Sequence, residues 1–466
     1  MQDLTTGPVT RHLIKTTSFM LVTMLFQTLY FLVDLYWVGR LGAKSVAAVG
    51  ISGNLMFIVL AITQMLGVGA TALISHAAGR KDHARALVVF NQSQVLSMVV
   101  AVVFLAIGML VRVAYARQLA PDPETASLAA SYLAWYIPAS ALQFGLVAMS
   151  SALRGIGNFK PGMIVQTGTV VINMVLAPVL IFGWGSGHPL GVSGAALATF
   201  IAVLVGTVWL LTWFLRPDSW LRFVTGDWKP QLPLWGSMLR VGLPAGAEFA
   251  LMGVYLFIVY VVTRPFGASA QAGFGIGMRI VQAGFLPVVA LGFAVAPVAG
   301  QNFGARKPER VYEVVRAALI MAASVMLLFA LLAHIAPAAM VRIFSKDPSV
   351  VAVGDTYLRI LSWNFIASGV IFVCASTFQA IGNTLPSLMS SFTRVILFGV
   401  PAVMLSKLAG FRLEWLWYLS VASVTLQMVV STLLLRREMR RRLAFAPADA
   451  AAPMPTPAIV ETAEAS

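Results

Sequence analysis

The chain contains few charged residues. Of its 466 residues, 59% are hydrophobic and only 11% are Asp, Glu, Lys or Arg. A soluble globular domain carries roughly 25% charged residues, so the composition excludes an ordinary soluble domain and places the chain among membrane proteins. The single cysteine, Cys374, has no partner of its own kind, which excludes a disulfide within the chain.

Motifs of catalysis and nucleotide binding are also missing. The sequence has no phosphate-cradling glycine loop, no His/Cys cluster with metal-ligand spacing and no credible Ser/His/Asp arrangement. We therefore expect a protein that is not an enzyme, needs no cofactor and is driven by an ion gradient. The net charge is +15, but the basic residues lie between apolar runs or at the C-terminus. This distribution predicts no nucleic-acid partner.

Long apolar stretches account for the missing charge. A helix that spans a bilayer needs about 20 predominantly apolar residues. Twelve stretches satisfy this requirement: 13–38, 46–74, 86–111, 127–152, 161–184, 190–215, 236–263, 271–298, 311–340, 352–380, 386–409 and 413–435. The pattern predicts an all-α integral membrane protein with 12 transmembrane helices.

The distribution of Lys and Arg predicts the orientation. With the N-terminus in the cytoplasm, 19 basic residues fall on the cytoplasmic side and nine on the outer side. We therefore expect both termini to be cytoplasmic in a multi-pass protein of the inner (plasma) membrane. Residues 1–12 would form the cytoplasmic N-terminus and 216–235 a cytoplasmic linker. Residues 436–466 would form a basic and then disordered tail.

The two halves of the chain repeat at a constant spacing of 225 residues. The clearest match aligns SALRGIGNFKP (151–161) with STFQAIGNTLP (376–386), and the same shift pairs Tyr132 with Tyr357. Each half holds six helices, an even number, so both halves begin on the same side of the membrane. This predicts two parallel six-helix bundles, related by a pseudo-twofold axis along the membrane normal, with a central cleft between them.

The two bundles follow directly from these spans. The N-lobe would comprise residues 13–215 and the C-lobe residues 236–435. A carrier of this architecture alternates between access to one face and access to the other.

Only two of the 17 acidic residues, Asp34 and Glu248, fall well inside a predicted span. An intramembrane charge costs on the order of 3 kcal/mol on insertion scales, which makes each residue a candidate functional site. A carboxyl group among apolar side chains favours its neutral form and can take up and release a proton. The alternative for Asp34 is an acid at the membrane surface that pairs with Arg40 or with a local backbone donor.

Glu248 is the candidate for a second acidic site. The 225-residue shift places it opposite Thr23, three turns from Asp34, so the two carboxylates would line one cavity at different depths. The alternative for Glu248 is a buried ion pair with Arg279. Candidate cavity partners are Arg279, Tyr36 and Gln282. The shift also aligns Asp34 with Val259, which favours the N-terminal half as the seat of ion coupling.

Several segments in this order resemble the multidrug and toxic compound extrusion (MATE) family. They are VDLYWVGRLGAKSVAAVG, RGIGNFKP, GVSGAALAT, AGQNFGAR and QAIGNTLP. The resemblance implies two six-helix lobes in a V and export of organic, often cationic compounds in exchange for H⁺ or Na⁺. It also implies that Asp34, Asn173 and Thr199 bind the coupling ion. Ala177 stands where many members have a second carboxylate, and Na⁺ favours several hard oxygen ligands, so we expect H⁺ rather than Na⁺.

The resulting hypothesis is a monomeric secondary antiporter in the lipid bilayer. It would export hydrophobic or cationic small molecules as protons enter through Asp34. The alternative is a flippase for lipids or lipid-linked oligosaccharides from the same superfamily, which the intramembrane Arg279 and Arg394 leave open.

Overall fold

The computed structural model describes residues 1–185 and 187–445, except for the side chain of Asn54. The first half of the chain forms α1 (Val9–Gly39), α2 (Ala43–Gly79), α3 (His83–Leu119), α4 (Pro123–Gly155), α5 (Lys160–Phe182) and α6 (Val192–Phe214). The short helix η1 (Thr225–Trp228) lies in the linker.

The second half forms α7 (Leu232–Thr263), η2 (Arg264–Phe266), α8 (Ala268–Gly304), α9 (Pro308–Ile335), α10 (Pro337–Arg342), α11 (Pro348–Leu361), α12 (Asn364–Ala380), α13 (Leu385–Leu405) and α14 (Leu413–Arg442). Eleven of these helices are long and apolar enough to cross a membrane, and α11 with α12 makes a twelfth span if the pair is counted as one. The prediction of an all-α protein with twelve spans is therefore confirmed for the described part of the chain.

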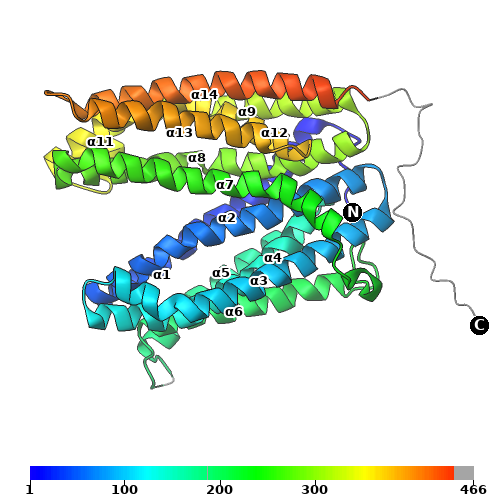
Figure 1. Ribbon diagram of the computed structural model, residues 1–466, viewed down its shortest axis with the longest axis horizontal. Coiled ribbons are helices and arrows are strands. Elements are labelled where there is room, and N and C mark those ends of the chain that lie inside the picture. Colours follow the sequence, from blue (N-terminus) through cyan, green and yellow to red (C-terminus); the bar gives the residue numbers. More distant parts are fainter. Residues whose placement is uncertain (186, 446–466) are drawn as a thin grey trace, which may run out of the picture.

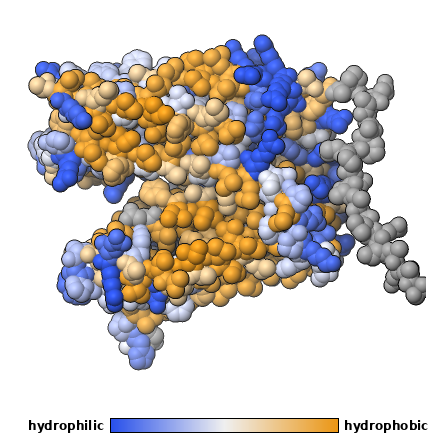
Figure 2. Space-filling model, viewed as in Figure 1, coloured by the Kyte–Doolittle hydropathy of each residue, from blue (hydrophilic) through white to orange (hydrophobic). Residues whose placement is uncertain are grey.

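The helices form two lobes arranged as a V (Figure 1). Helices α1–α6 make up the N-lobe and α7–α14 the C-lobe. The lobes meet at the end that holds the N-terminus, here called the closed end, and separate toward the other, the open end. Figure 2 shows a cleft between the lobes at the open end. Apolar residues cover the flanks of both lobes in this view and hydrophilic residues gather at the two ends, as expected for a protein that spans a bilayer.

Three predicted helix bounds need correction. The tenth span, 352–380, is two helices, α11 and α12, bent by 57°. Both parts are apolar and no proline marks the break, so the apolar pattern gave no signal for it. The ninth span, 311–340, ends earlier because Pro337 starts the separate helix α10.

The last span runs on through Arg442, so the basic run belongs to α14 and not to a tail. The helix continues because Arg is a good helix former and favours a helix C-terminus. The predicted disorder falls on residues 446–466, which lie outside the described residues.

Helices α1 and α7 each pack against both lobes. Leu13, near the start of α1, is buried in the core of the C-lobe. Met238, near the start of α7, is buried in the core of the N-lobe. Further along, α1 packs on α5 and α7 packs on α13, each within its own lobe. The two helices therefore tie the lobes together at the closed end.

Glycines let the helix backbones touch at the closed end. Gly242 of α7 lies so close to the Met65 carbonyl of α2 that a Cβ atom would overlap with it. Gly79 of α2 lies equally close to the Gln301 carbonyl of α8, and its repeat partner, Gly304 of α8, lies equally close to the His76 carbonyl of α2. Small residues are the usual means of close helix packing in membranes, where lipid tails compete equally for apolar side chains.

The N-terminal segment, residues 1–8, forms a strap across the closed end. The Gln2 N–H donates to the Ile156 carbonyl of the N-lobe (2.9 Å). The Leu4 N–H donates to Gln301 Oε1 of the C-lobe (3.0 Å), and Asn302 Nδ2 donates to the Leu4 carbonyl (3.1 Å). The Leu4 side chain is fully buried. The strap therefore joins the lobes by backbone hydrogen bonds.

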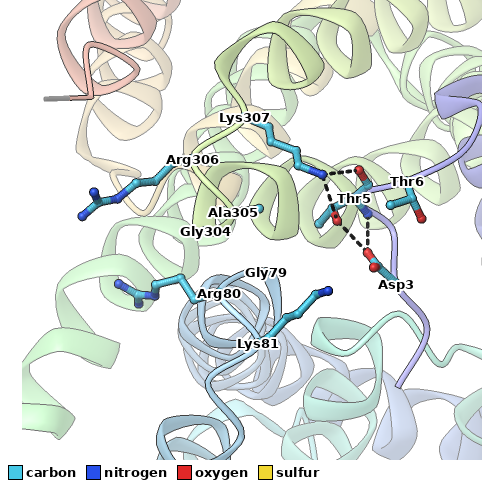
Figure 3. Close-up of a pocket in the computed structure, with 10 residues that line it drawn as sticks. All are labelled: Asp3, Thr5, Thr6, Gly79, Arg80, Lys81, Gly304, Ala305, Arg306 and Lys307. Carbon is cyan, nitrogen blue, oxygen red and sulfur yellow. Dashed lines mark hydrogen bonds between the residues drawn. The ribbon is translucent and has the colours of Figure 1, made fainter. Parts of the chain in front are cut away.

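A basic cavity of about 380 Å³ lies beside the strap (Figure 3). The α2–α3 and α8–α9 loops supply its basic residues, Arg80, Lys81, Arg306 and Lys307. Lys81 and Lys307 extend toward the strap, where Lys307 donates to the Thr5 carbonyl (2.9 Å). Partial burial raises the pKa of Asp3, but hydrogen bonds from Thr5 and the two lysine charges outweigh it and hold the pKa below its usual range. The charged Asp3 therefore helps to hold the strap in place.

Replacing Gly242 tests the contact between α7 and α2. Gly242→Val should push the two helices apart, because its Cβ would overlap with a carbonyl that cannot move independently of α2. Overpacking of this kind costs about 1–3 kcal/mol. We expect a lower midpoint of thermal unfolding in detergent. Gly253→Val is the matched control, because nothing lies within 4 Å of its Cβ position on the same helix. Equal destabilisation by the two variants would contradict the assignment.

Candidate functional site

Asp34 lies in α1 toward the open end of the N-lobe. It follows Tyr30 by four residues, so the two side chains share a helix face. The Asp34 Oδ1 atom is buried and has no hydrogen-bond partner. Its charge acts on the phenol groups of Tyr30, Tyr132 and Tyr136. The carboxyl group therefore faces a set of tyrosines from α1 and α4.

The alternative for Asp34, an ion pair with Arg40, is not formed among the described residues. The Arg40 guanidinium lies instead over the rings of Tyr36 (5.8 Å) and Trp37 (5.9 Å). Asp34 is thus not an interfacial acid neutralised by a neighbouring base.

Hydrogen bonds link Asn173, Thr199 and Tyr30. Asn173 Nδ2 donates to Thr199 Oγ1 (3.1 Å), and the Tyr30 hydroxyl lies 2.9 Å from the same oxygen. The Thr199 hydroxyl donates to the Ala195 carbonyl (3.2 Å). Because a hydroxyl has one hydrogen and two lone pairs, Thr199 accepts from both Asn173 and Tyr30. The structure therefore brings together the α5 and α6 residues that the sequence selected.

Two stacked tyrosines complete this N-lobe pocket. The rings of Tyr132 and Tyr136, one turn apart on α4, lie 5.5 Å apart at an angle of 24°. Ala177 is fully buried and packs in the same apolar cluster as Tyr132. We use the name N-lobe pocket for Tyr30, Asp34, Tyr132, Tyr136, Asn173 and Thr199. It contains one carboxylate, one amide and four hydroxyl groups.

None of the three tyrosines was selected from the sequence as a coupling-site residue. The signal was present, because Tyr30 precedes Asp34 by four residues and Tyr132 precedes Tyr136 by four. This spacing places each pair on one helix face. What the sequence could not show is that Asp34 of α1 lies within electrostatic range of the α4 tyrosines.

Glu248 does not belong to the N-lobe pocket and lies in the C-lobe. Its carboxylate interacts with Ser387 of α13, inside the C-lobe, and its Oε1 atom is buried without a hydrogen-bond partner. The alternative of an ion pair with Arg279 is also not formed among the described residues.

The three candidate cavity partners lie outside the N-lobe pocket. Tyr36 is 59% exposed at the end of α1. Arg279 and Gln282 are exposed on α8. They lie about four and three turns from Phe293 on the same helix face, and Phe293 contacts the Arg154 guanidinium of the N-lobe (5.4 Å). Both residues belong to the C-lobe, on the part of α8 that precedes its internal Pro287.

Two membrane-spanning lobes, a cleft between them and a cluster of buried polar side chains within one lobe are features of a multi-span membrane carrier. The sequence model of the MatE family matches residues 20–179 and 244–405, two segments that repeat at nearly the predicted spacing. The chain belongs to the MatE family, the family of multidrug and toxic compound extrusion transporters.

Curated relatives and a solved structure agree with this assignment. "Multidrug export protein MepA" of Staphylococcus haemolyticus is 26% identical and covers 78% of this chain and 80% of its own length. "Probable multidrug resistance protein NorM" of Thermotoga maritima is 26% identical and covers 83% of each chain. The structure described as "Outward-facing conformation of a multidrug resistance MATE family transporter of the MOP superfamily" superposes with a TM-score of 0.88. It is 24% identical and covers 95% of this chain and 98% of its own.

Thr199 holds the N-lobe pocket together, and Thr199→Val tests this role. The variant keeps the shape of the side chain but leaves the buried Asn173 amide and the Tyr30 hydroxyl without their shared acceptor. An unsatisfied buried polar group costs about 1–3 kcal/mol. We expect a lower thermal unfolding midpoint in detergent. Thr212→Val on the same helix is the control, because Thr212 bonds only to the Trp209 carbonyl. Indistinguishable midpoints for the two variants would refute the role.

Proposed function

We propose that the protein is a secondary antiporter that exports hydrophobic or cationic small molecules in exchange for inward H⁺, by alternating access. The observation that carries the proposal is the Asp34 carboxyl group, which is buried with an unpartnered oxygen beside the Tyr30, Asn173 and Thr199 network. Membership of the MatE family and the multidrug export names of its relatives support the substrate class.

The proposed orientation puts the closed end in the cytoplasm of a cell with an inner membrane. The basic loops of Arg80–Lys81 and Arg306–Lys307 and the basic end of α14 support it, because cytoplasmic loops are enriched in Lys and Arg. The cleft would then open to the outside, and the structure would be an outward-facing state. Both termini would be cytoplasmic.

Proton and substrate would compete for the N-lobe pocket. An ionised Asp34 attracts a cation, while a neutral Asp34 leaves only dipoles and tyrosine rings to hold it. A proton that enters from the outside therefore favours release of the substrate to the outside. Exchange requires that the two ligands alter each other's affinity, which is thermodynamic coupling between two binding events.

Helix α1 is the element that would pass this coupling to the lobes. Asp34 lies in its outer part, within the N-lobe, while Leu13 in its inner part is buried in the C-lobe core. A change in how α1 packs around Asp34 therefore acts on the same helix that ties the lobes at the closed end. In this proposal, both the protonation of Asp34 and the arrangement of the lobes change the packing of α1, which links the two.

The composition of the N-lobe pocket favours H⁺ over Na⁺. Na⁺ favours several hard oxygen ligands, and anionic oxygens contribute most to its binding. The N-lobe pocket has Asp34 as its one carboxylate, and Ala177 fills the position of the missing one. A proton needs a single carboxylate.

Asp34→Asn tests the coupling site. The amide is nearly isosteric with the neutral carboxyl group but cannot release a proton. We expect export of ethidium from cells to fall roughly tenfold or more, the range of typical coupling free energies. Asp218→Asn, an exposed acid in the linker, is the matched control. Both variants must reach the membrane in equal amounts, and wild-type export by Asp34→Asn would refute the proposal.

Proteoliposomes identify the coupling ion. An imposed pH gradient without sodium should drive ethidium movement by the wild type, and a sodium gradient at equal pH on both sides should not. Asp34→Asn should abolish the response to the pH gradient. Transport that appears only with sodium would show that the proton assignment is wrong.

A lipid or lipid-linked oligosaccharide flippase is the second candidate. One observation favours it, namely an exposed arginine, Arg279, within the membrane-spanning helix α8, because a guanidinium matches the oxygens of a phosphate group. Build-up of a lipid-linked precursor in a deletion strain, with normal susceptibility to toxic cations, would favour the flippase over the exporter.

A further inference from the structure

The C-lobe contains a buried basic residue that the proposed antiport mechanism does not use. Arg394 lies nine residues past the start of α13, about 14 Å along a helix of 21 residues, and so close to its midpoint. A charge at the middle of a membrane-spanning helix is expensive and is by default a functional-site hypothesis. The side chain is partly buried, and its Nε atom is fully buried.

Arg394 has no partner that neutralises it. Its Nε–H finds no acceptor, and no ion pair among the described residues includes Arg394. The guanidinium lies over the ring of Tyr255 of α7, 4.7 Å from the centroid. The acid that faces this region, Glu248, lies two turns before Tyr255 on α7, about 10 Å along the helix. At that distance Glu248 does not neutralise the Arg394 guanidinium, so the positive charge can interact with a ligand.

Further polar groups lie beside the arginine. The Tyr255 hydroxyl is 3.3 Å from Ser420 Oγ of α14, and Asn364 Nδ2 of α12 donates to the same oxygen over a long 3.4 Å. Asn364 Oδ1 is buried and has no partner. Tyr357 of α11 lies within electrostatic range of the Arg394 guanidinium. Asn364 is the first residue of α12, so the break between α11 and α12 places it here.

The internal repeat relates this cluster to the N-lobe pocket. The 225-residue shift aligns Tyr255 with Tyr30 and Tyr357 with Tyr132, so both sites are built on the same two tyrosines. The ionisable group differs. Val259 stands where the N-lobe has Asp34, and the C-lobe instead has Arg394. The two lobes therefore hold related polar sites of opposite charge.

We propose that Arg394, Asn364, Tyr255 and Ser420 form an anion-binding subsite in the C-lobe. It takes a carboxylate, sulfonate or phosphate group of an amphipathic compound. The guanidinium supplies the charge and a planar fork of donors that matches such oxygens, while the amide and the hydroxyls supply further donors. This deepens the proposed function, on which it rests, because it extends the transported compounds to those that carry a negative group.

A purely structural arginine would also stack on Tyr255. It would, however, need its remaining donors satisfied, because an unpaired buried donor costs free energy. The Nε–H of Arg394 is a buried donor without an acceptor. Such atoms are what a site keeps for a ligand.

The test uses two dyes that differ by one methyl group. Rhodamine 110 has a free carboxylate, and rhodamine 123 is its methyl ester. Binding to the purified full-length protein in detergent is measured by fluorescence anisotropy. We expect Arg394→Gln to weaken the binding of rhodamine 110 roughly tenfold, because a hydrogen bond to a charged group is lost. The same variant should weaken the binding of rhodamine 123 by less than about twofold, because the methyl ester has no charge to lose. Arg394→Lys, which keeps the charge but loses the fork, should fall between wild type and Arg394→Gln.

Controls exclude a folding defect. Arg316→Gln, at an exposed position of α9, should bind both dyes like the wild type. Removal of an unneutralised buried charge should not lower stability, so the thermal unfolding midpoint of Arg394→Gln should equal or exceed that of the wild type. Failure of the wild type to bind rhodamine 110, or an equal loss of both dyes in Arg394→Gln, would overturn the proposal.

Two further experiments distinguish a lipid phosphate from the anionic group of a transported compound. They also distinguish failure of the anion-binding proposal from failure of the antiport proposal. Phosphatidylglycerol is added in nanodiscs to the protein with bound rhodamine 110. If it displaces the dye from the wild type but has no effect on Arg394→Gln, the occupant of the subsite is a lipid phosphate. Displacement by soluble benzoate alone identifies the anionic group of a transported compound. Binding does not require transport, so a failed Asp34→Asn experiment would leave the dye difference intact.

Discussion

The close contact of backbones at the closed end is the constraint on which the rest of the molecule depends. Gly242, Gly79 and Gly304 bring helices of opposite lobes together without intervening side chains. Helices of this length that touch at one end and diverge must leave a space at the other. The cleft in Figure 2 is that space.

The duplicated scaffold carries different chemistry in each half. Tyr30 and Tyr255 occupy related positions, yet the first stands beside a carboxylate and the second beneath a guanidinium. Related halves of the chain thus give sites of opposite charge. A compound that bears both signs of charge, or two compounds of unlike charge, could use such a pair of lobes without any change of fold.

Much of this architecture could be predicted from the sequence. Twelve apolar stretches and a constant 225-residue offset predicted twelve spans in two related lobes, because the bilayer imposes a length on every helix. Asp34, Asn173 and Thr199 were selected by family resemblance, and the structure places all three in or beside one hydrogen-bonded network.

Other features could not be predicted for physical reasons. The bend between Leu361 and Asn364 leaves hydropathy unchanged, so an apolar window passes over it. The 225-residue shift and helix periodicity placed Glu248 on the helix face that corresponds to that of Asp34, but periodicity gives the face of a helix and not its neighbour. That neighbour is Ser387 of α13. Arg394 was noted as an intramembrane charge, but its partners come from four other helices.

The crossing of α1 has a consequence for how the protein is made. Leu4, Val9 and Leu13 are buried in the core of the C-lobe, where they pack with residues of α8 such as Val298. The ribosome completes α8 almost 300 residues after it makes Leu13. The beginning of the chain must therefore wait in the membrane, without its final partners, through most of translation. Two halves that look like independent modules are in this sense one folding unit, closed only when the second half arrives.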